Sequence, residues 1–307
     1  MKIVIVGAGA MGSLFASLLA KSKEEVWLLD KDKDRAAKIN HSGISVEGLS
    51  NFKAQIKATA DPQEIGTTYL VIICVKSYHT KEAMLFAKPV IGDDTMALTL
   101  QNGFGNVEVI GEIVGSDKVL GGVTNAGATL IECGKVRYAG KGETVVGTLD
   151  GRINVEMRYI RELFNKVGLE TKISRDIKGL IWSKLIINVG INALTAITRL
   201  NNGKLVELDG TRKIMRDAVT EAVKVAKRKR IKLIYDDPLA KVEAVCEATS
   251  ANVSSMLQDV LRNKRTEIDF INGVIVRQGQ EMGIPTPVNS LLVDLVKTIE
   301  SSYNISK

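Results

Sequence analysis

Apolar and polar positions in the first half of the chain switch repeatedly between two patterns. Short continuous runs rich in Val, Ile and Leu alternate with stretches of helical character. Such apolar runs are typical of strands buried on both faces, so the alternation predicts an α/β fold with a parallel, doubly wound sheet. The expected strands are residues 2–8, 24–30, 68–76 and 95–103, and the first expected helices are 11–22 and 33–43.

The pattern changes twice further along the chain. Residues 119–149 are rich in Gly, Val and Thr, which predicts short strands and turns. After about residue 172 strand signals largely vanish and helical periodicity dominates. We therefore expect a nucleotide-binding Rossmann-type domain at 1–172, an all-α domain at 173–307, and a ligand cleft between them. The expected helices of the second domain are 176–199, 204–230, 238–263, 266–282 and 287–302.

Composition narrows the class of protein. The chain has 307 residues, 45% of them hydrophobic and 25% charged, as in ordinary globular proteins. No apolar run reaches the roughly 18 uncharged residues that a membrane span needs. The first 20 residues imitate a signal peptide, but their glycines have a better explanation below. We expect a cytoplasmic protein without a membrane partner.

Charge and metal-ligating residues exclude further classes. The net charge of +7 favours anionic partners, yet the densest basic run, 222–233, keeps helical spacing and is best explained as a solvated face. No aromatic-interleaved basic patch, helix-turn-helix signal or zinc finger is present, and a small anionic ligand explains the charge equally well. Three scattered cysteines and two histidines predict no disulfide framework and no metal site. His79 is interpreted as a loop residue.

A glycine-rich turn follows the first expected strand. In "VGAGAMG", Gly7, Gly9 and Gly12 form a G-x-G-x-x-G, with Ala10 and Met11 between the last two glycines. Alone the motif is weak, but here it lies between a strand and a helix at the N-terminus. Gly7 allows the tight turn, Gly9 the approach of a pyrophosphate, and Gly12 close packing of the helix. We expect a dinucleotide at the helix N-terminus.

The end of the second strand gives mixed signals about the cofactor. Asp30 stands where an acidic side chain would accept hydrogen bonds from ribose hydroxyls, which favours NAD. Lys31 follows it and could pair with the 2′-phosphate of NADP. Lys76, after the third strand, could add charge near the same ribose or near the substrate. Either lysine could equally be plain surface.

An apolar stretch, "IWSKLIINVGINALTAITRL", carries three polar side chains on one face. Lys184, Asn188 and Asn192 are spaced i, i+4 and i+8, within an arc of about 80° on a helix. A buried ammonium or amide is costly unless another group satisfies it. The stripe therefore predicts either a partner elsewhere in the protein or a ligand.

Further polar residues could meet this stripe. Ser255 and Asp259 share a helical face, and Glu267 opens the next expected helix, where a capping box of Thr266 and Asp269 is predicted. Considered by itself, Glu267 is explained as an acidic residue in the first turn of a helix, where it interacts favourably with the helix dipole. A buried Lys184, however, also needs a counter-charge, which Glu267 could supply. Asn102 ends an expected strand, and parallel sheets bind ligands just past the carboxyl ends of their strands.

With these pieces the sequence resembles the ketopantoate reductase (2-dehydropantoate 2-reductase) family over nearly its full length. The glycine turn is shared by many dehydrogenases, whereas the lysine–asparagine helix and the last motif are specific. The segments that carry the resemblance are "GAGAMG", "VKSYHT", "LQNGFGN", "AGKGETVVG", "IWSKLIINVGINALTAI", "NNGKL" and "SSMLQDVLRNKRTEIDFINGVIV".

The resemblance implies a Rossmann domain joined to an all-α domain like that of 6-phosphogluconate dehydrogenase. It also implies reduction of ketopantoate to (R)-pantoate, usually with NADPH, in pantothenate and coenzyme A synthesis. Lys184 would be the general acid, and Lys31 and Lys76 would grip the 2′-phosphate. Asp30 before Lys31 departs from the family pattern and leaves NAD(H) open. Substrate would be positioned by Asn102, Asn188, Asn192, Asn202, Ser255 and Glu267, with Asn102 also near the cofactor.

Alternatives remain at this point. The chain could reduce another branched 2-oxo acid, because a family does not fix its substrate. It could be a non-catalytic nucleotide-binding sensor, although such a protein need not keep Lys184. Nucleic-acid binding from the net charge is the weakest alternative. A homodimer is possible, and neither feedback regulation nor growth temperature follows from the sequence.

Overall fold

The computed structural model describes residues 1–303, which form two compact units. The first unit contains Met1–Gln101 and Gly105–Ile177, and the second contains Asn102–Phe104 and the chain from Lys178 onward. The division lies five residues after the expected boundary of 172/173. It also assigns the segment Asn102–Phe104 to the helical unit.

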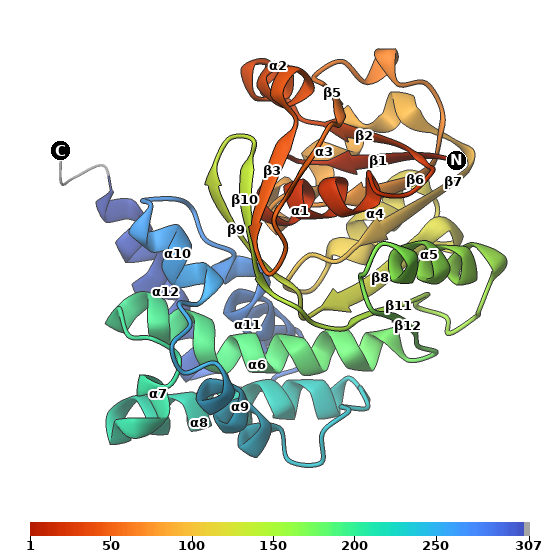
Figure 1. Cartoon of the computed structure of the whole chain (residues 1–307). Helices are drawn as coiled ribbons and strands as arrows, with labels where there is room; N and C mark the ends of the chain where they lie inside the picture. The colour runs from red at the N-terminus through yellow and green to blue at the C-terminus, as the bar shows by residue number, and fades with distance from the viewer. Residues whose placement is uncertain (304–307) are drawn as a thin grey trace. The chain divides into compact units, whose positions relative to one another are not determined.

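An eight-stranded sheet forms the centre of the first unit (Figure 1), with the order β12-β11-β8-β7-β6-β1-β2-β5. All its pairs are parallel except β11 with β8. The chain leaves β1 for β2 on one side and returns to β6 on the other, so β1 lies at the switch point where such sheets bind ligands. The strands are β1 (Lys2–Val6), β2 (Glu25–Leu29), β5 (Lys57–Thr59), β6 (Thr68–Ile73), β7 (Ile91–Thr99), β8 (Val119–Thr124), β11 (Thr144–Gly147) and β12 (Thr171–Ile173).

A second sheet of four strands was not expected as a separate layer. Its order is β4-β3-β10-β9, with β3 and β10 parallel and the other pairs antiparallel. Periodicity indicated short strands only in its second half, because three- to five-residue strands at 44–54 are too short for a clear pattern. The strands are β3 (Ile44–Gly48), β4 (Phe52–Ala54), β9 (Gly127–Glu132) and β10 (Lys135–Gly140).

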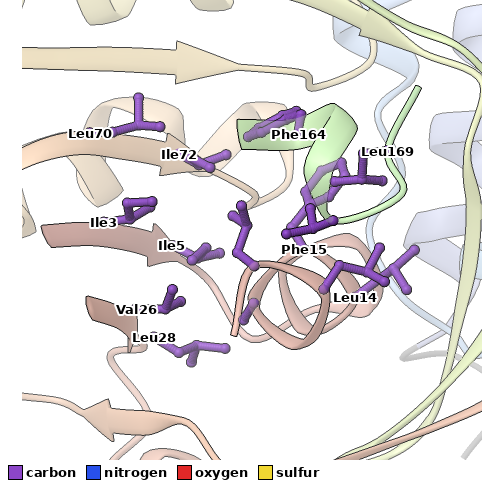
Figure 2. Close-up of a cluster of buried hydrophobic side chains, with 14 of the residues drawn as sticks. Ile3, Ile5, Leu14, Phe15, Val26, Leu28, Leu70, Ile72, Phe164 and Leu169 are labelled. Atoms are coloured by element: carbon purple, nitrogen blue, oxygen red, sulfur yellow. The ribbon is translucent and has the colours of Figure 1, made fainter. Parts of the chain in front are cut away.

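Helix α1 (Ala10–Leu19) is the core helix of the first unit. It contacts β1 and β2 of the large sheet as well as β3, β9 and β10 of the small sheet. Because both sides are covered, every residue from Gly12 to Leu19 is buried, which explains why the helix is apolar all round. Figure 2 shows Phe15 beside Phe164 of α5 (Val155–Lys166), with ring centroids 6.3 Å apart.

The remaining helices of the first unit begin at recognisable caps or turns. Asp32 caps α2 by accepting the N–H of Arg35, and Asn154 caps α5 by accepting the N–H of Met157. These helices are α2 (Lys33–Ser42), α3 (Thr80–Phe86) and α4 (Asn106–Val114), and the 3₁₀ turns are η1 (Pro62–Glu64), η2 (Ser77–His79), η3 (Lys88–Val90) and η4 (Ser116–Lys118).

The second unit is helical, as expected, but two of the expected helices are divided. The stretch 204–230 breaks at Leu208, whose backbone is extended, and 238–263 breaks at a loop before Ser254. Apolar periodicity continues across both breaks, which hides them in the sequence. The helices are α6 (Ile177–Thr198), α7 (Lys204–Glu207), α8 (Asp209–Arg228), α9 (Pro238–Ala248), α10 (Ser255–Leu261), α11 (Asn272–Glu281) and α12 (Pro287–Ser302).

Helix α6 is the central element of the second unit. By length and composition alone it could cross a membrane, although it contains charged residues, but 67% of its most apolar window is buried. It supplies Trp182, Leu185, Val189 and other residues to a core completed by α8, α9, α11 and α12. This burial is what the core helix of a globular unit requires.

The predicted helix 266–282 and its capping box are wrong. Glu267 precedes a 3₁₀ turn, η5 (Ile268–Phe270), and the regular helix α11 starts only at Asn272. Asp269 pairs with Lys297 at 2.7 Å, while the N–H of Thr266 donates to Glu300 at 2.7 Å. Because a carboxylate of α12 satisfies that N–H, Asp269 is not needed as a cap.

Close packing of α1 on β1 yields a stability prediction. A Cβ on Gly12 would lie 1.9 Å from the carbonyl oxygen of Gly7, so Gly12→Ala must displace backbone. We expect a loss of about 2 kcal/mol or more in the free energy of unfolding, measured by thermal and chemical denaturation followed by circular dichroism. Gly140→Ala is the control, because its Cβ would meet nothing closer than 3.7 Å. Equal stability of the two variants would contradict the packing argument.

Candidate functional site

The glycine turn is built as a dinucleotide site requires. Gly7 has φ +101°, a conformation that L side chains rarely adopt, and Gly12 packs against its carbonyl. Gly9, by contrast, has only the carbonyl oxygen of Cys74 near its hypothetical Cβ, at 3.9 Å. Sterics inside the protein thus require Gly7 and Gly12 but not Gly9, which leaves the approach of a ligand as the reason for the third glycine.

The start of α1 offers hydrogen-bond donors next to this turn. Gly9 is the N-cap, and Ala10 and Met11 are the first two residues of the helix. N–H groups in a first helical turn have no partner within the helix, and the helix dipole places positive charge there. The N–H of Ala8 is not available, because it donates to Asp30 Oδ2 at 2.7 Å. These residues fit a bound pyrophosphate.

Asp30, Lys31 and Lys76 all belong to the same unit as the glycine turn. Asp30 follows β2 and is only 5% exposed. Lys31 is exposed and forms an ion pair with Glu82 of α3 at 2.8 Å. Lys76 precedes η2 with an extended backbone and is half-buried. The structure therefore brings one buried carboxylate and two cations to the end of the sheet that carries the glycine turn.

Helix α6 bears the predicted polar face. Asn192 is 4% exposed, and Asn188 and Lys184 are half-buried. Among residues 1–303 no hydrogen-bond partner exists for the Nδ2 atoms of Asn188 and Asn192. A buried donor without a partner costs about 1–3 kcal/mol, so a ligand that offers acceptors to both amides would recover that energy.

Lys184 has an altered acidity. Burial is the main cause and lowers the pKa of its ammonium from the ordinary value to about 8, while the negative charge of Glu267 acts in the opposite direction. Glu267 is itself 6% exposed. A lysine with a pKa near 8 still carries its proton at neutral pH but releases it far more readily than a free lysine.

Asn102 reaches the helical unit through its neighbours. Strand β7 ends at Thr99, earlier than expected, and the segment Asn102–Phe104 joins the second unit. Phe104 donates its N–H to the carbonyl of Phe270 at 3.1 Å, and its ring lies 5.2 Å from that of Trp182. These contacts of Phe104 place the segment that contains Asn102 beside η5, which directly follows Glu267, and beside the first half of α6.

Ser255 and Asn202 stand at the other end of the α6 face. Ser255 is the first residue of α10, whose N-cap Ser254 accepts from the N–H of Leu257. Asn202 donates from Nδ2 to Thr249 Oγ1 at 2.9 Å, in the loop that leads to α10, and its Oδ1 has no partner in the described chain. Asn202 therefore fixes the conformation of this loop, and its Oδ1 can still accept a hydrogen bond.

Sequence reasoning missed two residues at this end. Thr195 lies on the same face of α6 as Lys184, and its Oγ1 is 2.6 Å from the Oγ of Ser254. This bond fixes the start of α10 against the polar face. The spacing of Thr195, three residues after Asn192, was a usable signal. The partnership with Ser254 was not visible, because 59 residues separate the two.

Residues 1–303 contain no group of three or more His, Cys, Asp or Glu side chains placed to hold a metal ion. The helical unit carries a lysine, amides, a hydroxyl and a carboxylate, and the sheet unit by itself carries a glycine turn. Fold and chemistry are those of a dinucleotide-dependent oxidoreductase with a helical second domain.

Comparison with known proteins identifies the family. The family model for ketopantoate reductase PanE/ApbA matches residues 3–151, and the model for its C-terminal domain matches residues 176–300. The chain belongs to the ketopantoate reductase family. Its second unit is the C-terminal domain of the 6-phosphogluconate dehydrogenase-like type that this family carries.

Individual relatives match over the whole chain. A 2-dehydropantoate 2-reductase of Pyrococcus horikoshii is 40% identical over 307 residues, covering 100% of both chains. The crystal structure of a ketopantoate reductase from Ralstonia eutropha superposes with a TM-score of 0.92 at 33% identity, covering 99% of this chain and 100% of that one. A D-mandelate dehydrogenase solved with NADH and anilino(oxo)acetate has a TM-score of 0.91 at 29% identity, with the same coverage.

The opposing influences on Lys184 can be tested directly. Glu267→Gln removes the charge that raises the pKa of Lys184, so we expect that pKa to fall below its value of about 8 in the wild type. The measurement is the pH dependence of amine modification at Lys184, followed by mass spectrometry. Glu243→Gln, which breaks the ion pair with Arg212 in the same unit, is the control. An unchanged titration in Glu267→Gln would show that the two groups do not interact.

Proposed function

We propose that the chain is a 2-dehydropantoate 2-reductase, which reduces the 2-oxo group of ketopantoate to (R)-pantoate in pantothenate and coenzyme A biosynthesis. The observation that carries the proposal is the α6 face, where a lysine of lowered pKa is followed by two amide donors that have no partner within residues 1–303. Membership of the ketopantoate reductase family over both domains supports it.

The cofactor is a nicotinamide dinucleotide, held by Gly7, Gly9, Ala10, Met11 and Gly12. When bound, its reduced nicotinamide supplies the hydride that forms the new C–H bond at the ketone carbon. Family resemblance favours NADP(H), with Lys31 and Lys76 at the 2′-phosphate. NAD(H) is the second possibility, and the relative solved with NADH supports it.

Lys184 supplies the proton. As the C=O double bond becomes a single bond, its electron pair moves to oxygen, where the developing negative charge is stabilised by the ammonium. The Nζ–H proton then passes to that oxygen, leaving alcohol and a neutral amine that solvent reprotonates. Burial makes Lys184 a better acid, and Glu267 keeps it charged at neutral pH.

The other side chains position the substrate. Asn188 and Asn192 donate their open Nδ2 groups to its carboxylate or carbonyl oxygens without adding charge. Ser255 binds the carboxylate and Glu267 accepts from the 4-hydroxyl. Asn102 and Asn202 complete the set, with Asn102 also near the cofactor. We further propose a cytoplasmic enzyme that acts on this small molecule without nucleic acid.

A second candidate function is the reduction of another branched 2-oxo acid. The close structural match to a D-mandelate dehydrogenase favours it, because one fold at a TM-score of 0.91 accommodates a different substrate. A non-catalytic sensor has no comparable support, since it would not need a lysine of lowered pKa beside unpartnered amides.

Lys184 should dominate turnover. In assays of ketopantoate reduction with NADPH and with NADH, we expect Lys184→Ala to lower kcat by roughly 100-fold or more, because no other group delivers the proton. The wild-type kcat should fall as pH rises through about 8, where the lysine loses its proton. Lys178→Ala, an exposed lysine of the same helix, is the control. Near-normal turnover by Lys184→Ala would refute the catalytic role.

Glu267 distinguishes the two candidate substrates. Glu267→Ala removes the acceptor for the 4-hydroxyl, so kcat/KM for ketopantoate should fall at least about tenfold more than for a branched 2-oxo acid that lacks the hydroxyl. Any change that Glu267→Ala causes in the acidity of Lys184 affects the reduction of both substrates, so it cancels when the two losses in kcat/KM are compared. Equal losses of kcat/KM on both substrates would show that Glu267 does not bind the 4-hydroxyl, and would favour the second candidate function.

A further inference from the structure

The buried carboxylate at the end of β2 is fully occupied by the protein. Asp30 Oδ2 accepts from the N–H of Ala8 at 2.7 Å, and Oδ1 accepts from the N–H of Asp32 at 3.0 Å. Arg35 Nη1 donates to both oxygens at 3.2 Å. A carboxylate offers about four acceptor positions. Asp30 therefore braces the glycine turn and has no acceptor position left for ribose hydroxyls.

The basic residues nearby are also paired. The guanidinium of Arg35 bridges Asp30 and Asp32, with 3.2 Å to an oxygen of each. Lys31 Nζ lies 2.8 Å from Glu82 Oε1. The second oxygen of Glu82 is 2.9 Å from Nδ1 of His79. Glu82 is thus held by Lys31, the second residue after β2, and by His79.

Glu82 is a carboxylate in its charged form. The hydrogen bond from Lys31 is the largest of the influences that hold the pKa of Glu82 below its usual range, and His79 adds to it. Its side chain is 56% exposed and that of Lys31 is 62% exposed, so the pair is open to a phosphate from solvent. Three carboxylates, on Asp30, Asp32 and Glu82, face the two cations Lys31 and Arg35.

A 2′-phosphate carries about −1.5 to −2 charges at neutral pH, and it would meet this arrangement at the end of β2. Lys31 would meet it with a charge already shared with Glu82, and the phosphate would lie close to a carboxylate. The unphosphorylated ribose of NADH meets no such repulsion. The cost falls on one cofactor only, which is what specificity requires.

We infer that Glu82 is a specificity-determining residue, which disfavours NADPH relative to NADH by engaging Lys31 and by placing a carboxylate beside the site of a 2′-phosphate. The inference rests on the proposed function only in requiring that the chain binds a nicotinamide dinucleotide. Lys76, half-buried before η2, adds positive charge at the same end of the sheet.

The test is the affinity for each reduced cofactor, measured by calorimetry without substrate. Glu82→Gln keeps the shape of the side chain but removes its charge. We expect the Kd for NADPH to fall roughly tenfold, as estimated for one unit charge about 4 Å from a phosphate in water, while the Kd for NADH changes less than about twofold.

A matched control exists in the same unit. Glu25 pairs with Lys57 at 2.8 Å and has 42% exposure, but it starts β2 and therefore lies at the opposite end of the strand from Lys31. Glu25→Gln should leave both Kd values unchanged. In the double variant Lys31→Ala with Glu82→Gln, the part of the gain that the freed lysine supplies should vanish, whereas the part that comes from removing the repelling carboxylate should remain.

The outcomes separate the inference from the proposed function. A Kd ratio that does not change in Glu82→Gln, or that changes equally in Glu25→Gln, overturns the inference while leaving the reductase intact. Failure of the wild-type chain to bind either cofactor overturns the proposed function and the inference with it. Selective tightening of NADPH in Glu82→Gln alone supports the inference.

Discussion

A partly buried ammonium on an apolar helix is the constraint around which the second unit is organised. Lys184 loses hydration when α6 packs, and this loss lowers its pKa to about 8. The negative charge of Glu267 limits this fall in the pKa of Lys184. Glu267 has a non-helical backbone, with φ −95° and ψ 25°. Glu267 thus lies outside regular helix, directly before η5, and α11 begins only at Asn272.

Contacts between residues distant in sequence surround the rest of the α6 face. These contacts fix the conformation of loops and do not extend the hydrophobic core. The bond between Thr195 and Ser254 fixes the start of α10, and Asn202 holds the loop before it through Thr249. Phe104, bound to the carbonyl of Phe270, fixes Asn102 at the opposite end. Loops positioned by a rigid helix supply site residues at little cost to the core. Within residues 1–303, the Nδ2 atoms of Asn188 and Asn192 on this face are then left without a hydrogen-bond partner.

Periodicity predicted the parts of the molecule that depend on local burial. The parallel strands β1, β2 and β6 are continuous apolar runs, and the i, i+4 spacing on α6 is enough to place three polar side chains on one helical face. The four-stranded sheet, the break at Leu208 and the true partner of Thr266 escaped prediction. Each of these depends on a segment distant in sequence, or on a backbone change that leaves the apolar pattern intact.

The cofactor end shows what residue type alone leaves out, namely the contacts that each side chain already makes within the protein. An aspartate after the second strand favours NAD by its position, and a lysine after it favours NADP. The structure gives the aspartate four protein contacts and gives the lysine a carboxylate partner from α3. A carboxylate whose acceptor positions are filled must give up a protein contact before it can accept from a ribose, and a lysine paired with a carboxylate brings that carboxylate close to any phosphate it binds. We therefore infer that selection between the cofactors depends on Glu82, a residue that no motif on β2 includes.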